Sequence, residues 1–283
     1  MKLLFIVDAH VHLWNPAQFR YGWLDSLPVL NRAFLPADFS AASAKAGVGK
    51  FIFVECGCAA TQSLAEADWV SDLAKGEPRL KGVVAQAPLE YGEASRPELE
   101  KLARRPLVKG VRRNLQGEQD LEFCLRPEFV TGVKLLAEFG FTFDVCIRPE
   151  QLPAVAELAR RVPQVTFVLD HLGKPDVRGK QFEPWAADLK TLASAPNVVC
   201  KVSGLATEAH WEQWQPDDLK FYFDHARECF GFGRLLFGGD WPVATLATGY
   251  DRWLATVREL FSFATEAEQV QLFQTNAERL YRV

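Results

Sequence analysis

Residues 3–12 of the chain have the sequence LLFIVDAHVH, an apolar run that ends in an aspartate and two histidines. Apolar runs with polar residues at their carboxyl ends recur along the whole chain. Eight are present, at 3–10, 50–56, 81–87, 108–114, 141–147, 165–171, 197–204 and 234–240. They are rich in Val, Ile and Phe and do not alternate cleanly between apolar and polar residues. This pattern is typical of parallel strands that are buried on both faces.

Segments with a helical spacing of apolar residues fill the gaps between these runs. Helices are predicted at 37–47, 61–75, 97–105, 126–140, 149–162, 184–195, 216–231, 250–262 and 265–281. Several open on Pro, Asp or Thr and end near Gly, as helix boundaries commonly do. Strand–helix units in unbroken alternation predict a single-domain (β/α)8 barrel over residues 1–283. A doubly wound open sheet is the alternative, and it is disfavoured because no GxGxxG motif follows an early strand.

Composition argues against several classes of partner. The 283 residues are 48% apolar, enough for a large core, and the net charge of −4 comes without a basic stripe. Nucleic acid and membranes are therefore not expected as partners, and no apolar stretch approaches the length of a membrane span. The first residues lack a small-residue cleavage site, and the six scattered cysteines are expected as reduced thiols. We therefore expect a cytoplasmic protein without a secretion signal.

Ionisable residues gather where the predicted strands end. A barrel carries its chemistry at the carboxyl ends of its strands, so these residues are candidates for a site. Apolar interiors do not collect many such groups unless they face one another or a ligand. The candidates are His10, His12, Glu55, Arg112, Arg113, Asp144, Asp170, His171, Lys201, Ser203 and Asp240.

The two histidines of the first strand are separated by one residue. Residues i and i+2 of a strand project to the same face, so His10 and His12 are predicted to point together, with Asp8 below them. Two imidazoles at a barrel mouth can bind a metal or polarise a carbonyl oxygen. The alternative is a pair of core histidines that are satisfied by hydrogen bonds. The presence of His171 and Asp240 at matching heights on strands six and eight favours a site.

Charged and aromatic residues near the same end are candidates for substrate binding. Lys201 and Asp144 lie within apolar strands, and we expect both to face the cavity, with a structural ion pair as the alternative for the lysine. Trp14 and the loop residues Tyr21 and Trp23 can pack against a sugar ring, although such residues are more often part of a core. The aromatic residues of 19–34 fit either a contact in a homo-oligomer or a lid over the pocket.

Six stretches, spread in order over nearly the whole chain, resemble the amidohydrolase superfamily and within it the branch of sugar and pyrone lactonases. They are VDAHVHLW, KGVRRNLQ, FVLDHLGKP, VVCKVSGL, LLFGGDWPV and TNAERLY. The resemblance implies a (β/α)8 barrel that hydrolyses small lactones. It implies that Asp240 deprotonates the attacking water and that Arg112 contacts the substrate. It also matches the family's histidines on strands one and six to His10, His12 and His171.

The resemblance also bears on metal content. Binuclear members of the superfamily use a carboxylated lysine at the end of strand four and additional histidines. Here strand four ends in two arginines, and strand five has Asp144 where many metal-dependent relatives have a histidine. We therefore expect no binuclear site. A single zinc on His10, His12 and Asp240 is compatible with the sequence, but the lactonase branch works without a required metal, so no cofactor is expected to be essential.

The expected reaction opens a small lactone, of the sugar-acid class, to its hydroxy acid. Asp240 takes a proton from water while the three histidines polarise the carbonyl. The carboxylate of the product is expected to meet Arg112, Arg113 or Lys201. Two other functions remain open. A zinc-dependent decarboxylase of an unsaturated carboxylic acid needs a strand-five histidine that is missing here, and a non-catalytic sugar-binding barrel has no need of a general base.

Overall fold

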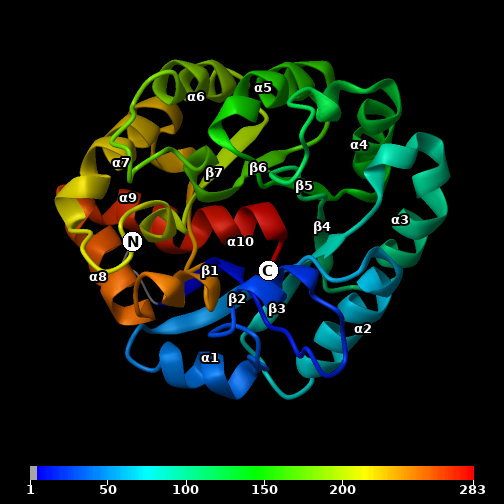
Figure 1. Ribbon diagram of the computed structural model, residues 1–283, viewed down its shortest axis with the longest axis horizontal. Helices are drawn as coiled ribbons and strands as arrows, with labels where there is room; N and C mark the ends of the chain where they lie inside the picture. The colour runs from blue at the N-terminus through cyan, green and yellow to red at the C-terminus, as the bar shows by residue number, and fades with distance from the viewer. Residues whose placement is uncertain (1–4) are drawn as a thin grey trace.

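A computed structural model describes residues 5–283. Its eight parallel strands follow one another in chain order and form a nearly closed barrel inside a ring of helices (Figure 1). The strands are β1 (Ile6–Val11), β2 (Val48–Val54), β3 (Leu80–Gln86), β4 (Val108–Arg112), β5 (Thr142–Val145), β6 (Phe167–Leu169), β7 (Val198–Val202) and β8 (Leu235–Phe237). The (β/α)8 barrel is therefore confirmed. Residues 3 and 4 of the first expected strand lie outside the described residues.

The helices lie close to where the sequence predicts them. They are α1 (Pro36–Ala42), α2 (Ser63–Leu73), α3 (Arg96–Ala103), α4 (Pro127–Phe139), α5 (Leu152–Arg161), α6 (Trp185–Ala193), α7 (Pro216–Phe230), α8 (Tyr250–Leu260), α9 (Glu266–Val270) and α10 (Asn276–Tyr281). The helix expected over 265–281 contains a π-helical turn at Gln271–Thr275, between α9 and α10. None of the helices described is long and apolar enough to cross a lipid bilayer.

Hydrogen bonds join β1 to the segment that follows β8 and close the ring. The backbone N–H of His12 donates to the carbonyl oxygen of Trp241 at 2.7 Å, and that of Asp240 donates to the carbonyl oxygen of His10 at 2.8 Å. Val11 and Trp241 form an isolated parallel bridge at the same place. The seam of the barrel therefore runs through the residues that carry the first-strand histidines and Asp240, and it sets their relative positions.

Helix α10 covers the amino-terminal end of the strands and crosses the middle of the ring in Figure 1. Asn276 Nδ2 donates to the carbonyl oxygens of Phe232 and Leu235, at the start of β8. Tyr281 belongs to the apolar cluster inside the barrel, which includes residues of β1, β2, β3, β6 and β8. Because α10 closes this end, a ligand reaches the interior from the carboxyl ends of the strands.

The last part of β1 departs from regular alternation. Its register with β2 shifts between Asp8 and Val11. The Asp8 carboxylate turns toward the helical layer, where it accepts hydrogen bonds from Tyr250 Oη of α8 at 2.6 Å and from the Gly239 N–H at 2.8 Å. The expectation that Asp8 lies below the histidines is therefore wrong. The irregular register, rather than strict alternation, brings His10 into the barrel.

Candidate active site

A cavity of about 310 Å³ opens at the carboxyl end of the barrel. This is the end at which (β/α)8 enzymes carry their chemistry, and the volume suits a small one-ring compound. The lining residues lie at the ends of the strands and in the loops that follow them. They are His12, Trp23, Leu27, Cys56, Gly57, Arg112, Asn114, Gln116, Cys146, His171, Lys174, Thr207, Asp240 and Val243.

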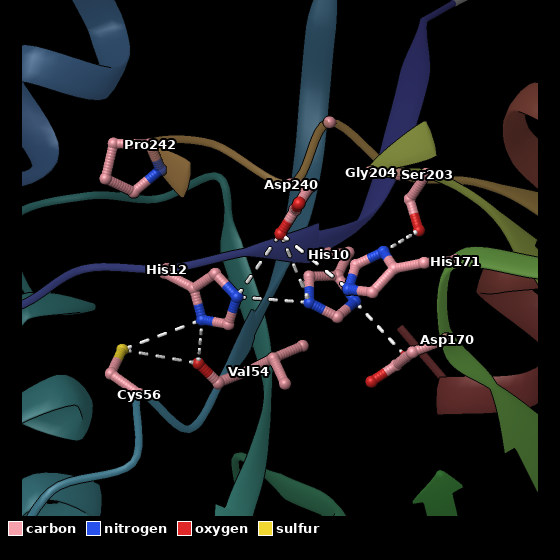
Figure 2. A network of polar contacts seen from close by, with 12 residues as sticks. His10, His12, Val54, Cys56, Asp170, His171, Ser203, Gly204, Asp240 and Pro242 are labelled. Atoms are coloured by element: carbon pink, nitrogen blue, oxygen red, sulfur yellow. Dashed lines mark hydrogen bonds and ion pairs between the residues drawn. The ribbon is translucent and has the colours of Figure 1, made fainter. Parts of the chain in front are cut away.

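Three histidines surround the Asp240 carboxylate (Figure 2). Asp240 Oδ1 lies 3.5 Å from His12 Nε2 and 3.7 Å from His10 Nε2. The Nε2 atom of His171 lies 3.9 Å from the same oxygen. All four side chains are buried. The structure therefore brings together the four residues that the sequence selects as the centre of a site.

A backbone carbonyl and a carboxylate orient the two histidines of β1. His12 Nδ1–H donates to the Val54 carbonyl oxygen at 2.8 Å, which leaves the lone pair on Nε2 (Figure 2). His10 Nδ1 lies 3.2 Å from both Asp170 Oδ1 and Lys201 Nζ, and His10 Nε2 lies 3.1 Å from His12 Nε2. Burial, offset only in part by the Asp170 carboxylate, lowers the pKa of His10 well below its ordinary value. His10 is therefore neutral at pH 7.

His171 reaches the site through a strained turn after β6. Its φ angle is 54°, and residues 172–174 have φ angles between 53° and 70°. Four consecutive residues thus occupy the left-handed region, which is unfavourable for residues that carry a Cβ atom. Trp185 Nε1–H supports the turn by donating to the Leu172 carbonyl oxygen at 2.8 Å. The turn brings the side chains of His171 and Lys174 to the same cavity.

Ser203 and Gly204, which follow β7, contact the His171 side chain. His171 Nδ1 lies 2.8 Å from Ser203 Oγ. A Cβ atom on Gly204, whose φ angle is 65°, would lie 2.5 Å from His171 Nδ1 and 2.9 Å from Asp240 Oδ2. A side chain at this position therefore has no room. Burial, offset in part by Asp240, lowers the pKa of His171 to about 4.

The surroundings of Asp240 keep its carboxylate ionised. Burial opposes the charge, but the proximity of His171, His12 and His10 outweighs it, and the pKa of Asp240 lies well below its ordinary value. Its backbone also adopts a left-handed conformation, with a φ angle of 51°. Asp240 thus presents a charged acceptor to the cavity at physiological pH.

His10, His12 and Asp240 form a donor set that fits one divalent metal ion. Two imidazole Nε2 atoms and one carboxylate oxygen converge, with separations of 3.1, 3.5 and 3.7 Å. In a tetrahedral zinc site, bonds of about 2.0–2.2 Å place neighbouring ligand atoms about 3.3–3.6 Å apart. The Val54 carbonyl and the Asp170 carboxylate orient the two imidazoles as outer partners do at metal sites. The residues therefore fit a single ion.

The model of an amidohydrolase family, Amidohydro_2, matches residues 7–283. The chain belongs to this amidohydrolase family. The match confirms the resemblance that the six sequence stretches indicate.

Relatives of this amidohydrolase include enzymes with named substrates. An L-fucono-1,5-lactonase from Burkholderia multivorans is 34% identical over 290 residues, which cover 97% of this chain and 95% of the relative. An L-fucono-1,5-lactonase from Burkholderia ambifaria is 31% identical over 288 residues, covering 99% and 97%. A crystal structure of an amidohydrolase from Burkholderia multivorans with bound zinc has a TM-score of 0.88 and 31% identity, over 99% of each chain. The reaction class expected from the sequence, hydrolysis of a lactone ester bond, is the one that the names of these lactonases give.

Two of the expected substrate-binding residues of this amidohydrolase lie beneath the site. Lys201 Nζ lies 2.5 Å from Asp144 Oδ2 and 3.0 Å from Asp170 Oδ1, and all three side chains are fully buried. Tyr281 Oη of α10 donates to Asp144 Oδ2 at 3.0 Å. Lys201 and Asp144 do not line the described cavity. The expectation that they face the substrate is therefore wrong. The two residues form the structural ion pair that was the alternative for the lysine.

Arg113 is also directed away from the cavity. Its Nε–H donates to Glu90 Oε1 at 3.0 Å, and its terminal amino group lies 2.7 Å from Glu118 Oε1. Neighbouring residues of a strand point to opposite faces, and Arg112 takes the inner face. The expectation that Arg113 contacts substrate is therefore corrected.

Trp14 and Trp23 lie between β1 and β2, and one of them lines the cavity. Trp14 is fully buried and donates its Nε1–H to the Arg32 carbonyl oxygen at 2.9 Å, so it packs within the loop and the expected substrate contact is corrected. Trp23 lines the cavity and donates its Nε1–H to the Cys56 carbonyl oxygen at 2.8 Å. The loop thus supplies one wall of the cavity through Trp23.

Arg112 lines the cavity, but protein groups occupy its guanidinium. Its Nε–H and one terminal amino group donate to Glu55, at 2.6 Å to Oε1 and 2.5 Å to the carbonyl oxygen. The other terminal amino group donates to Asp170 Oδ2 at 3.1 Å. Two carboxylates therefore compensate one buried cation.

Lys174 and Gln116 line the cavity and are missed by sequence reasoning. Both belong to stretches that carry the family resemblance, FVLDHLGKP and KGVRRNLQ, but they follow the strand ends by several residues. Lys174 Nζ donates to Gln116 Oε1 at 2.7 Å. Burial opposes its charge, but Cys146, Glu208 and Asp240 outweigh burial and raise the pKa of Lys174. Lys174 is therefore a charged residue of the cavity wall.

Proposed function

We propose that this amidohydrolase opens a small lactone of the sugar-acid class to its hydroxy acid. The observation that carries the proposal is the Asp240 carboxylate, which lies within 3.9 Å of three histidine Nε2 atoms beside a cavity of about 310 Å³. The L-fucono-1,5-lactonases of Burkholderia, with 31% and 34% identity over nearly the whole chain, support the same reaction.

Asp240 acts in this proposal as the general base. Its carboxylate takes a proton from a water molecule, whose oxygen attacks the lactone carbonyl carbon. Collapse of the tetrahedral intermediate breaks the bond between this carbon and the ring oxygen. The proton held by Asp240 then passes to the departing ring oxygen, which becomes the hydroxyl group of the product. The site returns to its starting protonation state.

His171 acts as a donor to the carbonyl oxygen. His171 Nδ1 lies 2.8 Å from Ser203 Oγ, and in this proposal the hydroxyl donates to Nδ1 while the ring proton is on Nε2, which faces Asp240. An imidazole N–H aimed at the developing oxyanion contributes roughly 3–4 kcal/mol of transition-state stabilisation. Neutral His171 is suited to this role because it donates without adding a charge.

A single divalent ion would be held by His10, His12 and Asp240. When bound, it would polarise the carbonyl oxygen and acidify a water molecule. A second ion is not expected, because β4 and β5 offer Arg112 and Asp144, which are engaged in ion pairs. Asp170, which with His10 and His171 forms the other possible ligand set, is paired with Arg112 and Lys201. We propose one ion at most, and a reaction that does not require it.

A proton-release assay over a panel of lactones tests the proposed function. The panel contains L-fucono-1,5-lactone, other aldono-1,4- and 1,5-lactones, and 2-pyrone-4,6-dicarboxylate. We expect turnover of at least one sugar-acid lactone, and Asp240→Asn should lower it at least about a hundredfold while leaving the fold intact. The matched control is Asp251→Asn, the same change at an exposed position on α8. Turnover of Asp240→Asn within a few-fold of the parent contradicts the role of Asp240 as the base. A parent enzyme that hydrolyses none of the lactones contradicts the proposed function.

A further inference from the structure

We infer that Lys174 is the cation that binds the carboxylate of the hydroxy-acid product. The inference rests on the proposed lactone hydrolysis and deepens it. It assigns to a residue beyond the strand ends the role that the sequence alone assigns to Arg112, Arg113 or Lys201. The anion it recognises is a polyhydroxy carboxylate.

Lactone opening creates a negative charge inside the cavity. A neutral ester enters, and the carboxylic acid that forms at the former carbonyl carbon releases its proton to solvent and becomes a carboxylate. The Asp240 carboxylate already lies in this cavity and is ionised. A second carboxylate in a partly desolvated space needs a cation or strong hydrogen-bond donors near it. The cavity should therefore contain a positive charge that protein carboxylates compensate only in part.

The other candidate cations do not meet this requirement. The Arg112 guanidinium donates to Glu55 and Asp170 with all three of its nitrogen atoms. Lys201 is fully buried between two carboxylates, and Arg113 points toward Glu90 and Glu118. A ligand carboxylate beside Arg112 would be the third carboxylate around a single cation.

Lys174 has the opposite arrangement. Its hydrogen-bond partner is the neutral amide oxygen of Gln116, at 2.7 Å. It forms one ion pair, a long one with Glu208, whose Oε1 lies 3.7 Å from Nζ, whereas Arg112 and Lys201 each contact two carboxylates at 2.5–3.1 Å. An ammonium group has three N–H donors, so further donors are available for a ligand after Gln116 is satisfied. The side chain is 21% exposed, which leaves it accessible from the cavity.

The backbone that carries Lys174 supports the same role. Lys174 and His171 are the two ends of the left-handed turn after β6, and both line the cavity. Strained backbone that persists in a native fold is concentrated at functional sites. The turn places a proton donor for the carbonyl and a cation for the product on one wall of the cavity.

Lys174 and Gln116 also line a neighbouring cavity of about 610 Å³. The ammonium group therefore lies at the boundary between the catalytic cavity and a second space. A cation in this position can hold the product carboxylate while the product leaves. Product binding, rather than chemistry alone, should therefore depend on Lys174.

The test compares binding of an anion with binding of its neutral counterpart. The probes are the hydroxy acid and the matching alditol of the best lactone in the panel, L-fuconate and L-fucitol if that lactone is L-fucono-1,5-lactone. The two compounds share their hydroxyl groups and differ in the carboxylate. Dissociation constants are measured by calorimetry for the parent and for Lys174→Gln, Lys174→Arg and Lys75→Gln. Lys75 is an exposed lysine before β3, so its substitution removes the same charge away from the cavity.

Lys174→Gln should bind the hydroxy acid about tenfold or more weakly, because a charge-assisted contact is lost. Its affinity for the alditol should change less than about twofold, because a neutral ligand gains little from the positive charge of Lys174. Lys174→Arg should retain most of the affinity for the acid, and Lys75→Gln should match the parent for both probes.

Unchanged affinity of Lys174→Gln for the hydroxy acid overturns the inference. An equal loss for acid and alditol also overturns it, because it indicates general damage to the cavity. If the parent hydrolyses lactones and either result is found, the inference fails alone. If the parent hydrolyses none of the lactones, the proposed function fails and the inference falls with it.

Discussion

Two groups of polar side chains lie in the same barrel, and only one of them faces a cavity. The rim cluster consists of His12, His171, Lys174 and Asp240, which line the cavity. The interior cluster consists of Asp144, Asp170, Lys201 and Tyr281, which are fully buried beneath it. His10 lies between the two, with Nδ1 beside Asp170 and Nε2 beside Asp240.

The difference between the clusters is pairing, not residue type. In the interior cluster Lys201 is in contact with both Asp144 and Asp170, so its charge is compensated inside the protein. In the rim cluster Asp240 is surrounded by imidazoles, and Lys174 contacts a neutral amide. Burial of a charged residue therefore does not by itself indicate function. A charge at a cavity whose internal counter-charge is distant, as Glu208 is from Lys174 at 3.7 Å, is a better indicator.

The largest expected effect comes from removing the cation of the interior cluster. Lys201→Met leaves the buried Asp144 carboxylate without a cation and removes one of the two cations beside Asp170, so it should lower the free energy of unfolding by about 3–5 kcal/mol. Lys174→Met at the rim removes the same charge and should cost less than about 1 kcal/mol, because the ion pair that it breaks, with Glu208 at 3.7 Å, is long and partly exposed to solvent. Chemical denaturation of both variants measures the difference. Similar losses for the two lysines would show that the clusters are not distinct.

A smaller effect is expected from acid at the rim. The pKa of His171 is about 4 in the folded protein against an ordinary value of 6.5, so between these values the unfolded chain binds a proton that the folded chain does not. Its contribution to stability is complete above pH 6.5 and is lost as the pH falls toward 4, by about 3 kcal/mol at most.

The variant His171→Asn tests this contribution. Asparagine tolerates the left-handed backbone and does not titrate. From pH 7 to pH 4.5, the free energy of unfolding should fall more for the parent than for the variant. Parallel losses in the two proteins would contradict the depressed pKa of His171.

The smallest expected effect is that of chelation on turnover. The proposed mechanism draws on Asp240 and His171, which remain in place when a metal is removed. We expect at most one zinc per chain after loading, and turnover within a few-fold of the untreated enzyme after prolonged chelator treatment. Metal analysis and activity are measured on the same samples. Complete loss of turnover that zinc restores would show that His10 and His12 serve the reaction by binding a metal.

The barrel and the centre of the site could be predicted from the sequence for a definite physical reason. Strands buried on both faces must be continuously apolar, so each of the eight is visible as a short run, and the helices between them follow from their spacing. The carboxyl ends of parallel strands meet at one end of a barrel. His10, His12, His171 and Asp240 could therefore be placed together without coordinates.

Tertiary structure alone decided which charged residues of this protein reach the cavity. The pairing of Lys201 with Asp144 joins residues 57 positions apart, and Arg113 turns outward because Arg112 takes the inner face. Lys174 enters the site through a left-handed turn whose strain no local preference favours. Strand position predicts the end of the barrel at which a residue lies. Its depth and the partner that neutralises it depend on contacts between segments far apart in the chain, which a linear pattern does not contain.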